Sequence, residues 1–167
     1  SNDFGTKGVK EYALKLETQA DAKLFHSKMV NACIRAHHQA DSIEQSQLHV
    51  AIIGAGATGV ELAAELHRTT REVVAYGLDG IDADKDLKIS LIEAADRILP
   101  ALNPRLSDAT EQLITRLGVH VHTKSKVMEV TPKGIRLADG QTIDSELVVW
   151  AAGVKAPDFL NNFGGLE

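Results

Sequence analysis

The spacing of apolar and polar positions changes several times along the chain, and each change predicts a new element. Short apolar runs rich in β-branched residues predict buried strands at 48–53 and 88–92. Apolar residues at helical spacing predict longer elements around and between these strands. The predicted helices cover 19–39, 60–74 and 103–117.

Local signals mark where two of these helices begin. The first follows Thr18, which together with Asp21 resembles a capping box. The last starts at Asn103-Pro104 and is stopped by Gly118. Its apolar residues are expected to line one face of the helix: Leu106, Leu113, Ile114 and Leu117.

Short strands dominate the part of the chain after this helix. Tight turns at 132–134 and 138–140 separate strand-like segments and predict an antiparallel meander. The strands predicted here are 119–122, 126–131, 134–137, 142–143 and 147–150.

The order of the elements predicts an α/β fold. Strands that alternate with helices make a doubly wound, Rossmann-like parallel sheet with flanking helices. The three-stranded meander precedes the last strand. We expect residues 1–47 to form a leading segment and helix packed on the domain, and residues 48–167 to form the Rossmann domain.

Composition removes several other classes of protein. The net charge of −5 argues against binding to nucleic acid or anionic lipid by bulk charge. The single cysteine, Cys33, excludes an intramolecular disulfide framework and a cysteine zinc site. The longest uncharged apolar runs have eight residues, whereas a spanning helix needs about 20. Neither a membrane span nor a signal peptide is therefore expected.

A glycine loop between the strand 48–53 and the next helix is the main candidate for chemistry. Gly54, Gly56 and Gly59 form a GxGxxG pattern, with Ala57 and Thr58 between the last two glycines. The pattern alone is weak, but here it follows a predicted strand and opens a predicted helix. The glycines allow a tight turn, approach of a pyrophosphate and close helix packing, and the helix start attracts phosphate. The loop predicts a dinucleotide site.

An acidic residue at the end of the second strand supports this interpretation. Glu93 is placed to bind the adenosine ribose, which favours NAD(H) over NADP(H) because a carboxylate repels the extra phosphate. Its separation from Gly54 is 93 − 54 = 39 residues, longer than the usual separation of about 20. An insertion before the strand explains the excess. Arg97 could reach a phosphate, although we expect it to be a surface ion-pair partner.

Glu61 and the histidines can be explained without a functional role. Glu61 lies in the first turn of a helix, where the dipole alone favours a carboxylate, or it could point at the nicotinamide end. His120 and His122 share a strand face, and His37 and His38 are adjacent on a helix. No acidic or thiol ligand lies at suitable spacing, so no metal site is expected.

Three strings in order resemble one family. GAGATGVELAAEL, IEAADRILPAL and VVWAAGVKAP are similar to segments of the type II NADH dehydrogenases, relatives of the pyridine nucleotide-disulfide oxidoreductases. The resemblance implies that the glycine loop holds the NADH pyrophosphate and Glu93 the adenosine ribose. Glu61 matches a carboxylate that hydrogen-bonds the nicotinamide. Ala152 and Gly153 match the backbone turn beside the nicotinamide and the flavin.

The resemblance also implies an activity for a longer parent enzyme. Hydride passes from NADH to FAD and electrons pass to a quinone, on a peripheral protein at the cytoplasmic face of the inner membrane. The FAD-binding motifs and the membrane-seating segment are not found in this sequence. We therefore expect a soluble NAD-binding domain that binds NADH but not FAD, does not turn over, and could form a homodimer.

Two other functions use a glycine loop of this kind. One is a non-catalytic, NAD-sensing regulatory module, and the other is a methyltransferase. The predicted meander favours the flavoenzyme over the regulatory module. A methyltransferase usually has an acidic residue just before its loop, whereas His49 and apolar residues precede Gly54 here.

Overall fold

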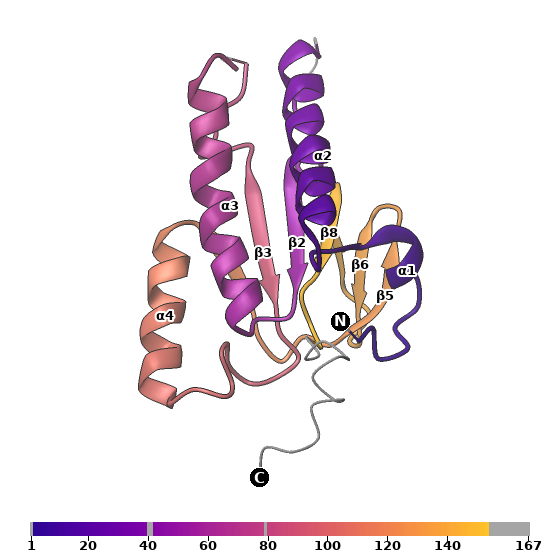
Figure 1. The fold of residues 1–167 in the computed structure, drawn as a ribbon, viewed down its shortest axis with the longest axis vertical. Helices are drawn as coiled ribbons and strands as arrows, with labels where there is room; N and C mark the ends of the chain where they lie inside the picture. The colour runs from indigo at the N-terminus through magenta and orange to yellow at the C-terminus, as the bar shows by residue number, and fades with distance from the viewer. Residues whose placement is uncertain (1, 40–41, 79, 154–167) are drawn as a thin grey trace.

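Within the part of the chain that the structure describes, the main sheet consists of five parallel strands. The computed structural model describes residues 2–39, 42–78 and 80–153 (Figure 1). The strands lie in the order β1–β8–β2–β3–β4, and every neighbouring pair is parallel. They are β1 (Leu14–Lys15), β8 (Leu147–Trp150), β2 (His49–Ile53), β3 (Lys88–Ile92) and β4 (Val119–His122). The predicted Rossmann-like sheet is confirmed.

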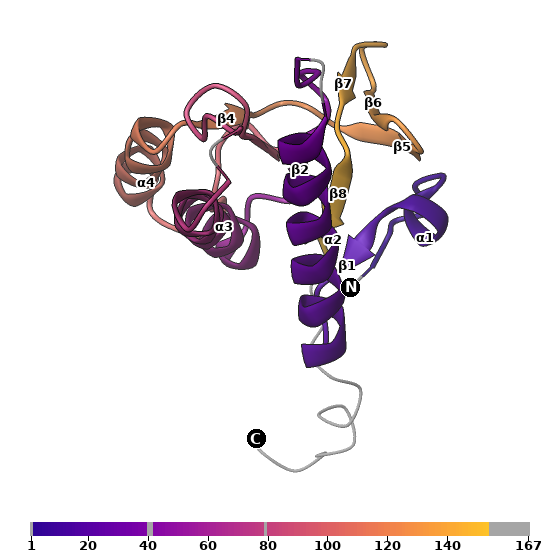
Figure 2. The same cartoon turned by 90° about the horizontal axis from the view of Figure 1, so that it is seen from above.

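Three helices cover one face of this sheet. They are α2 (Gln19–His38), α3 (Ala57–Ala75) and α4 (Pro104–Arg116). Figure 2 shows them side by side, with α3 between the other two. Alternate strand residues, such as Val50, Ile52 and Leu91, pack with their apolar side chains in the larger core cluster.

The opposite face carries the antiparallel meander instead of further long helices, so the prediction of a doubly wound sheet, with helices on both faces, is wrong. Its strands are β5 (Val127–Thr131), β6 (Gly134–Leu137) and β7 (Thr142–Asp144). They form a separate three-stranded sheet, with β6 in the middle. Val130 and Ile135 of this sheet share a second core cluster with Ala51, Ile53 and Trp150. The predicted meander before the last strand is also confirmed.

Helix α2 begins at the predicted capping box. The Thr18 hydroxyl oxygen accepts a hydrogen bond from the Asp21 N–H at 3.1 Å, and the Asp21 carboxylate accepts one from the Thr18 N–H at 2.8 Å. Both backbone donors would otherwise lack partners at the helix start. The residues that α2 buries follow helical spacing: Phe25, Met29, Ala32, Cys33 and Ala36.

The leading segment contains two elements that the sequence pattern does not predict. One is the single-turn helix α1 (Val9–Tyr12), and the other is the edge strand β1. Leu14 pairs with Val149 and Lys15 with Trp150, so β1 extends the main sheet. The leading segment therefore shares the sheet of the Rossmann domain, and α2 shares its core.

Helix α3 begins at Ala57 rather than at the predicted Val60. Gly56 is the N-cap residue, and its carbonyl accepts a hydrogen bond from the Val60 N–H at 3.1 Å. Gly59 is consequently a helical residue and not a loop residue. The sequence pattern places the boundary too late because glycine is an unfavourable helix residue unless packing requires it.

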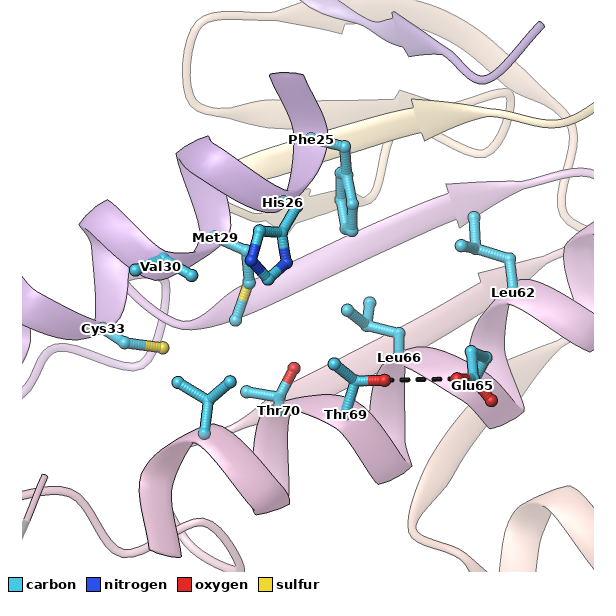
Figure 3. Close-up of a pocket in the computed structure, with 11 residues that line it drawn as sticks. Phe25, His26, Met29, Val30, Cys33, Leu62, Glu65, Leu66, Thr69 and Thr70 are labelled. Carbon is cyan, nitrogen blue, oxygen red and sulfur yellow. Dashed lines mark hydrogen bonds between the residues drawn. The ribbon is translucent and has the colours of Figure 1, made fainter. Parts of the chain in front are cut away.

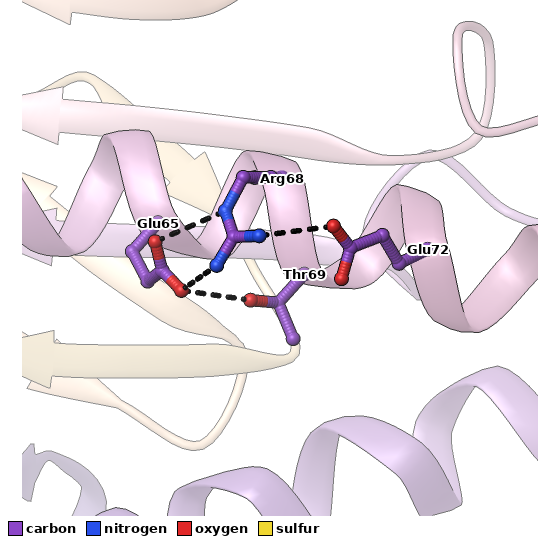
Figure 4. Close-up of polar contacts among 4 residues, drawn as sticks. All are labelled: Glu65, Arg68, Thr69 and Glu72. Atoms are coloured by element: carbon purple, nitrogen blue, oxygen red, sulfur yellow. Dashed lines mark hydrogen bonds and ion pairs between the residues drawn. The ribbon is translucent and has the colours of Figure 1, made fainter.

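Exposed charged side chains of α3 form ion pairs with one another along the helix. Arg68 bonds Glu65 at 2.6 Å and Glu72 at 3.0 Å, and the Thr69 hydroxyl donates to Glu65 (Figure 4). The hydrogen bond from Arg68 lowers the pKa of the Glu65 carboxyl. These groups are exposed to solvent, so the ion pairs add little to the stability of the helix.

Helix α4 begins where predicted but buries only part of the predicted apolar face. The Asn103 side chain accepts a hydrogen bond from the Arg105 N–H at 2.9 Å and caps the helix. Of the four apolar residues expected on one face, Ile114 is buried, whereas Leu106, Leu113 and Leu117 are exposed. Across the three described ranges, no helix is long and apolar enough to cross a membrane.

Candidate nucleotide site

A cavity of about 800 Å³ lies at the carboxyl ends of β2, β3 and β8. Ligands of open α/β sheets bind at this edge. The cavity brings together most of the predicted site residues: Gly54, Gly56, Ala57, Thr58, Glu93, Ala152 and Gly153. Gly59 and Glu61 are not among the residues that line it.

Two of the glycines allow backbone segments to approach each other. Gly54 has φ +103°, and a Cβ there would lie 2.7 Å from the Ala152 nitrogen. Only glycine therefore allows the loop to pack this closely against the residues that follow β8. A Cβ on Gly59 would lie 1.8 Å from the Gly54 carbonyl oxygen. These contacts fix the start of α3 against the end of β2, and they fit the predicted tight turn and close packing.

Gly56 differs from its two neighbours in the motif. Its φ is −73°, and a Cβ built there would meet no atom within 4 Å. The protein itself therefore does not require glycine at this position. No side chain caps the N-terminus of α3 within the part of the chain described here, so its first N–H groups have no side-chain acceptor. The arrangement fits a bound pyrophosphate.

Glu93 joins three loops at the edge of the cavity. One carboxylate oxygen accepts a hydrogen bond from the Ala55 N–H at 2.8 Å, and the other accepts one from the Ala95 N–H at 2.9 Å. Its own N–H donates to the His122 carbonyl at 2.8 Å. Each carboxylate oxygen has a second lone pair, so both can still accept from a ribose hydroxyl.

Arg97 takes a different position from the one expected. Its guanidinium donates to the carbonyl of Pro100 at 3.0 Å rather than to a carboxylate, and it does not line the cavity. The expected surface ion pair is therefore wrong. The Arg97 side chain instead holds the loop that follows Glu93.

Glu61 is exposed and is the fifth residue of α3, so it lies beyond the first turn, in contrast to the sequence expectation. Its position leaves the nicotinamide role a prediction. The cavity also contains residues that sequence reasoning missed, namely Phe4, Thr6, Lys126 and Trp150. The first two lie in a segment without periodicity, so only the folded arrangement brings them to this site.

A second cavity, of about 180 Å³, lies between α2 and α3 (Figure 3). Apolar side chains from both helices dominate its lining, including Phe25, Met29 and Leu66. None of the predicted site residues belongs to it. Among the residues described, no three His, Cys, Asp or Glu side chains gather in a way that could hold a metal ion.

The whole chain, residues 1–167, matches the family model described as pyridine nucleotide-disulphide oxidoreductase. A type II NADH:quinone oxidoreductase of Haemophilus influenzae is 34% identical over 179 residues, covering 100% of this chain and 40% of that protein. The mitochondrial external alternative NAD(P)H-ubiquinone oxidoreductase B1 of Arabidopsis thaliana is 35% identical, covering 97% of this chain and 29% of that protein. The chain thus spans at most two fifths of these relatives.

A solved structure has the same fold. NDH2 from Plasmodium falciparum in complex with NADH superposes with a TM-score of 0.85 at 26% identity, covering 98% of this chain and 34% of that one. The resemblance to type II NADH dehydrogenases is confirmed by these matches. On its sequence and its fold, this chain belongs to the pyridine nucleotide-disulphide oxidoreductase family.

Proposed function

We propose that this chain is the NADH-binding domain of a flavin-dependent NADH:quinone oxidoreductase. The cavity at the carboxyl ends of the strands carries the proposal, because an uncapped helix start, an open glycine and a carboxylate meet there. A dinucleotide uses these features for its phosphates and its ribose. The names of the relatives, which include an NADH:quinone oxidoreductase, support the same function.

The chain's own groups have distinct tasks in this proposal. The N–H groups of Ala57 and Thr58, in the first turn of α3, would face the pyrophosphate, and Gly56 would leave room for its approach. The positive end of the helix dipole favours the phosphates. Glu93 would accept hydrogen bonds from the adenosine ribose through the lone pairs that its backbone donors leave free.

Glu93 would also select the cofactor. The extra phosphate of NADPH, about 4 Å from this carboxylate, would meet a repulsion of about 4 kcal/mol at an effective dielectric of 20. Arg97 is tied to the Pro100 carbonyl and does not line the cavity, so it offers that phosphate little compensation. We therefore propose NADH rather than NADPH.

The turn after β8 would hold the nicotinamide end. Ala152 and Gly153 line the cavity there, and Glu61 is proposed to contact the nicotinamide. Bound NADH supplies a hydride from its nicotinamide ring. In the longer parent enzyme, we propose FAD as its acceptor, a quinone as the final acceptor, and a peripheral position on the cytoplasmic face of the inner membrane. The 167-residue chain is proposed to bind NADH without FAD and without quinone reduction.

Calorimetric titration of the chain with NADH, NADPH and S-adenosylmethionine tests the proposal. We expect binding heat with NADH, much less with NADPH, and none with S-adenosylmethionine. Glu93→Gln removes the negative charge and should narrow the preference for NADH over NADPH by at least about tenfold. Asp108→Asn, an exposed carboxylate outside the cavity, is the matched control. A wild-type chain that does not bind NADH contradicts the proposal.

The proposed role of Glu61 needs the full-length parent enzyme, where hydride transfer can be followed. Glu61→Gln should lower the rate of flavin reduction by NADH, since it removes the carboxylate acceptor for the nicotinamide amide. If both the rate and the NADH affinity stay unchanged, Glu61 does not contact the nicotinamide.

A further inference from the structure

Residues 2–6 fold over the end of β8 and form one wall of the nucleotide cavity. The Asn2 N–H donates to the Gly153 carbonyl at 2.8 Å. The Asn2 carbonyl in turn accepts a hydrogen bond from the Trp150 indole N–H at 2.9 Å. Both partners belong to β8 or its final turn, so this short segment is fastened to the strand.

Phe4 lies at the tip of this segment in an unusual conformation. Its φ is +51°, in the left-handed region that a residue with a bulky side chain rarely adopts. Its N–H donates to the Asn2 side-chain oxygen at 2.9 Å, and the next residue, Gly5, donates to the Asp3 carboxylate at 3.0 Å. Local hydrogen bonds therefore hold the strained backbone in place.

This conformation does not bury the Phe4 ring. The side chain is 67% exposed, yet the residue lines the cavity. An exposed aromatic ring on a strained, hydrogen-bonded segment gains little from packing within the chain itself. Residues held in sparsely populated backbone conformations cluster at binding sites, and apolar surface that faces a cavity is available to a ligand.

The ring lies against the turn expected beside the nicotinamide. A Cβ on Gly153 would lie 2.9 Å from the Cε2 and Cζ atoms of Phe4. Along the sheet, β2 and its glycine loop separate β8 from β3, which leads to Glu93. Phe4 and Glu93 thus lie on opposite sides of the loop that would hold the pyrophosphate, with an aromatic group on one side and a carboxylate on the other.

We propose that Phe4 is a binding residue whose ring stacks on the nicotinamide of NADH. This inference rests on the proposed NADH site and adds a residue to its nicotinamide end. An aromatic ring offers a flat apolar surface to the planar nicotinamide ring, as aromatic pairs do in protein cores. The fastened segment holds the ring in position before the ligand arrives.

ADP-ribose provides the matching test, because it keeps the adenosine, both phosphates and both riboses of NADH but lacks the nicotinamide. Calorimetric titration of Phe4→Ala should show NADH binding about 3- to 10-fold weaker than in the wild type. ADP-ribose binding should change by less than about twofold in the same variant, since its contacts do not reach the ring. Phe4→Trp, which keeps an aromatic surface, should retain NADH affinity.

Two further variants separate the ring from its surroundings. Phe4→Gly removes the ring and the backbone strain together, and it should lose the same NADH affinity as Phe4→Ala. Tyr76→Ala removes a 92% exposed aromatic ring outside the cavity and should leave both ligands unaffected. Equal weakening of NADH and ADP-ribose in Phe4→Ala, or no weakening of either, overturns the stacking role. A wild-type chain that binds neither ligand overturns the NADH site and this inference with it.

Discussion

The helix over the middle of the sheet buries more of its side chains than the helix beside the β4 edge. Helix α3 lies between α2 and α4 (Figure 2) and buries Val60, Ala63 and Leu66 against the strands. Helix α4 packs beside the edge strand β4 and buries only Ser107 and Ile114 among its side chains. Both helices have regular apolar spacing. Their places in the layer, and not their periodicity, decide how much of each apolar face is covered.

The buried polar residue of α4 illustrates the same difference. The Ser107 hydroxyl donates to the Ile98 carbonyl at 2.6 Å, so a hydroxyl occupies part of the face that a central helix fills with apolar side chains. Meanwhile Leu106, Leu113 and Leu117 project outward. A helix that packs against the protein on only one side buries only part of its apolar face, and the rest of that face stays exposed.

The largest expected effect lies in the middle of the sheet, at Gly59. Gly59→Ala places a Cβ 1.8 Å from the Gly54 carbonyl oxygen, so α3 has to move away from the loop. We expect a loss of about 3 kcal/mol of unfolding free energy, measured by urea denaturation. Gly56→Ala is the control, because its Cβ would meet open space.

This control carries a prediction of its own. Gly56→Ala should cost about 1 kcal/mol or less of stability, as expected for alanine at an N-cap position. Its NADH affinity should fall sharply, since the added methyl group occupies the space proposed for the pyrophosphate. For the Gly59→Ala prediction of the preceding paragraph, stability equal to that of the wild type would contradict the close packing of α3 against the loop.

Much of the middle of the sheet could be predicted from the sequence. The strand 88–92 was placed correctly because a buried parallel strand is a short, nearly continuous apolar run. The contribution of Glu93 to the cavity followed from its place directly after that strand. These signals are local in the chain, so one sequence is enough to detect them.

Other features depend on contacts between distant residues. Strand β1 has two residues, and its pairing with Val149 and Trp150 has no periodic signal in the chain. Phe4 lies at the cavity because Asn2, two residues before it, hydrogen-bonds to Gly153 and Trp150, which are almost the whole chain away. The exposed face of α4 likewise follows from its position at the sheet edge.

A leucine in the middle helix gives the next largest effect. Leu66 is 6% exposed and belongs to the larger core cluster. Leu66→Ala should lower the unfolding free energy by about 2–3 kcal/mol, because it removes buried apolar surface and leaves a space. Urea denaturation at constant pH measures this loss. A loss below about 1 kcal/mol would mean that α3 is no better packed than the edge helix.

The other face of the sheet provides a test by pH. His49 of β2 shares a hydrogen bond of 2.8 Å with Ser90, and burial lowers the pKa of His49 to about 4. Lys88, His120 and His122 add smaller effects in the same direction, and a backbone hydrogen bond at Asp144 opposes them. Burial also lowers the pKa of His122 at the edge.

The sign follows from proton binding. Below about pH 6.5 the unfolded chain binds a proton at His49 that the folded chain does not bind until about pH 4, so stability falls as the pH decreases through this interval. Allowing for the partial exposure of the ring, we expect a loss of about 1–2 kcal/mol. Urea denaturation from pH 7 to 4 measures it. His49→Gln should flatten this part of the profile, and an unchanged profile would exclude His49 as its source.

The smallest effect is expected at the edge, in a leucine of α4 matched to Leu66. Leu113 is 60% exposed, so Leu113→Ala should change the unfolding free energy by less than about 0.5 kcal/mol. The same substitution thus has a large effect in one helix and almost none in the other, although both leucines follow the helical spacing. Denaturation at two protein concentrations, with sedimentation of both samples, completes the test. A loss of unfolding free energy above about 1 kcal/mol that grows with protein concentration would mean that a second copy covers this face of α4 in solution. The difference in burial between α3 and α4 would then hold only for the monomer.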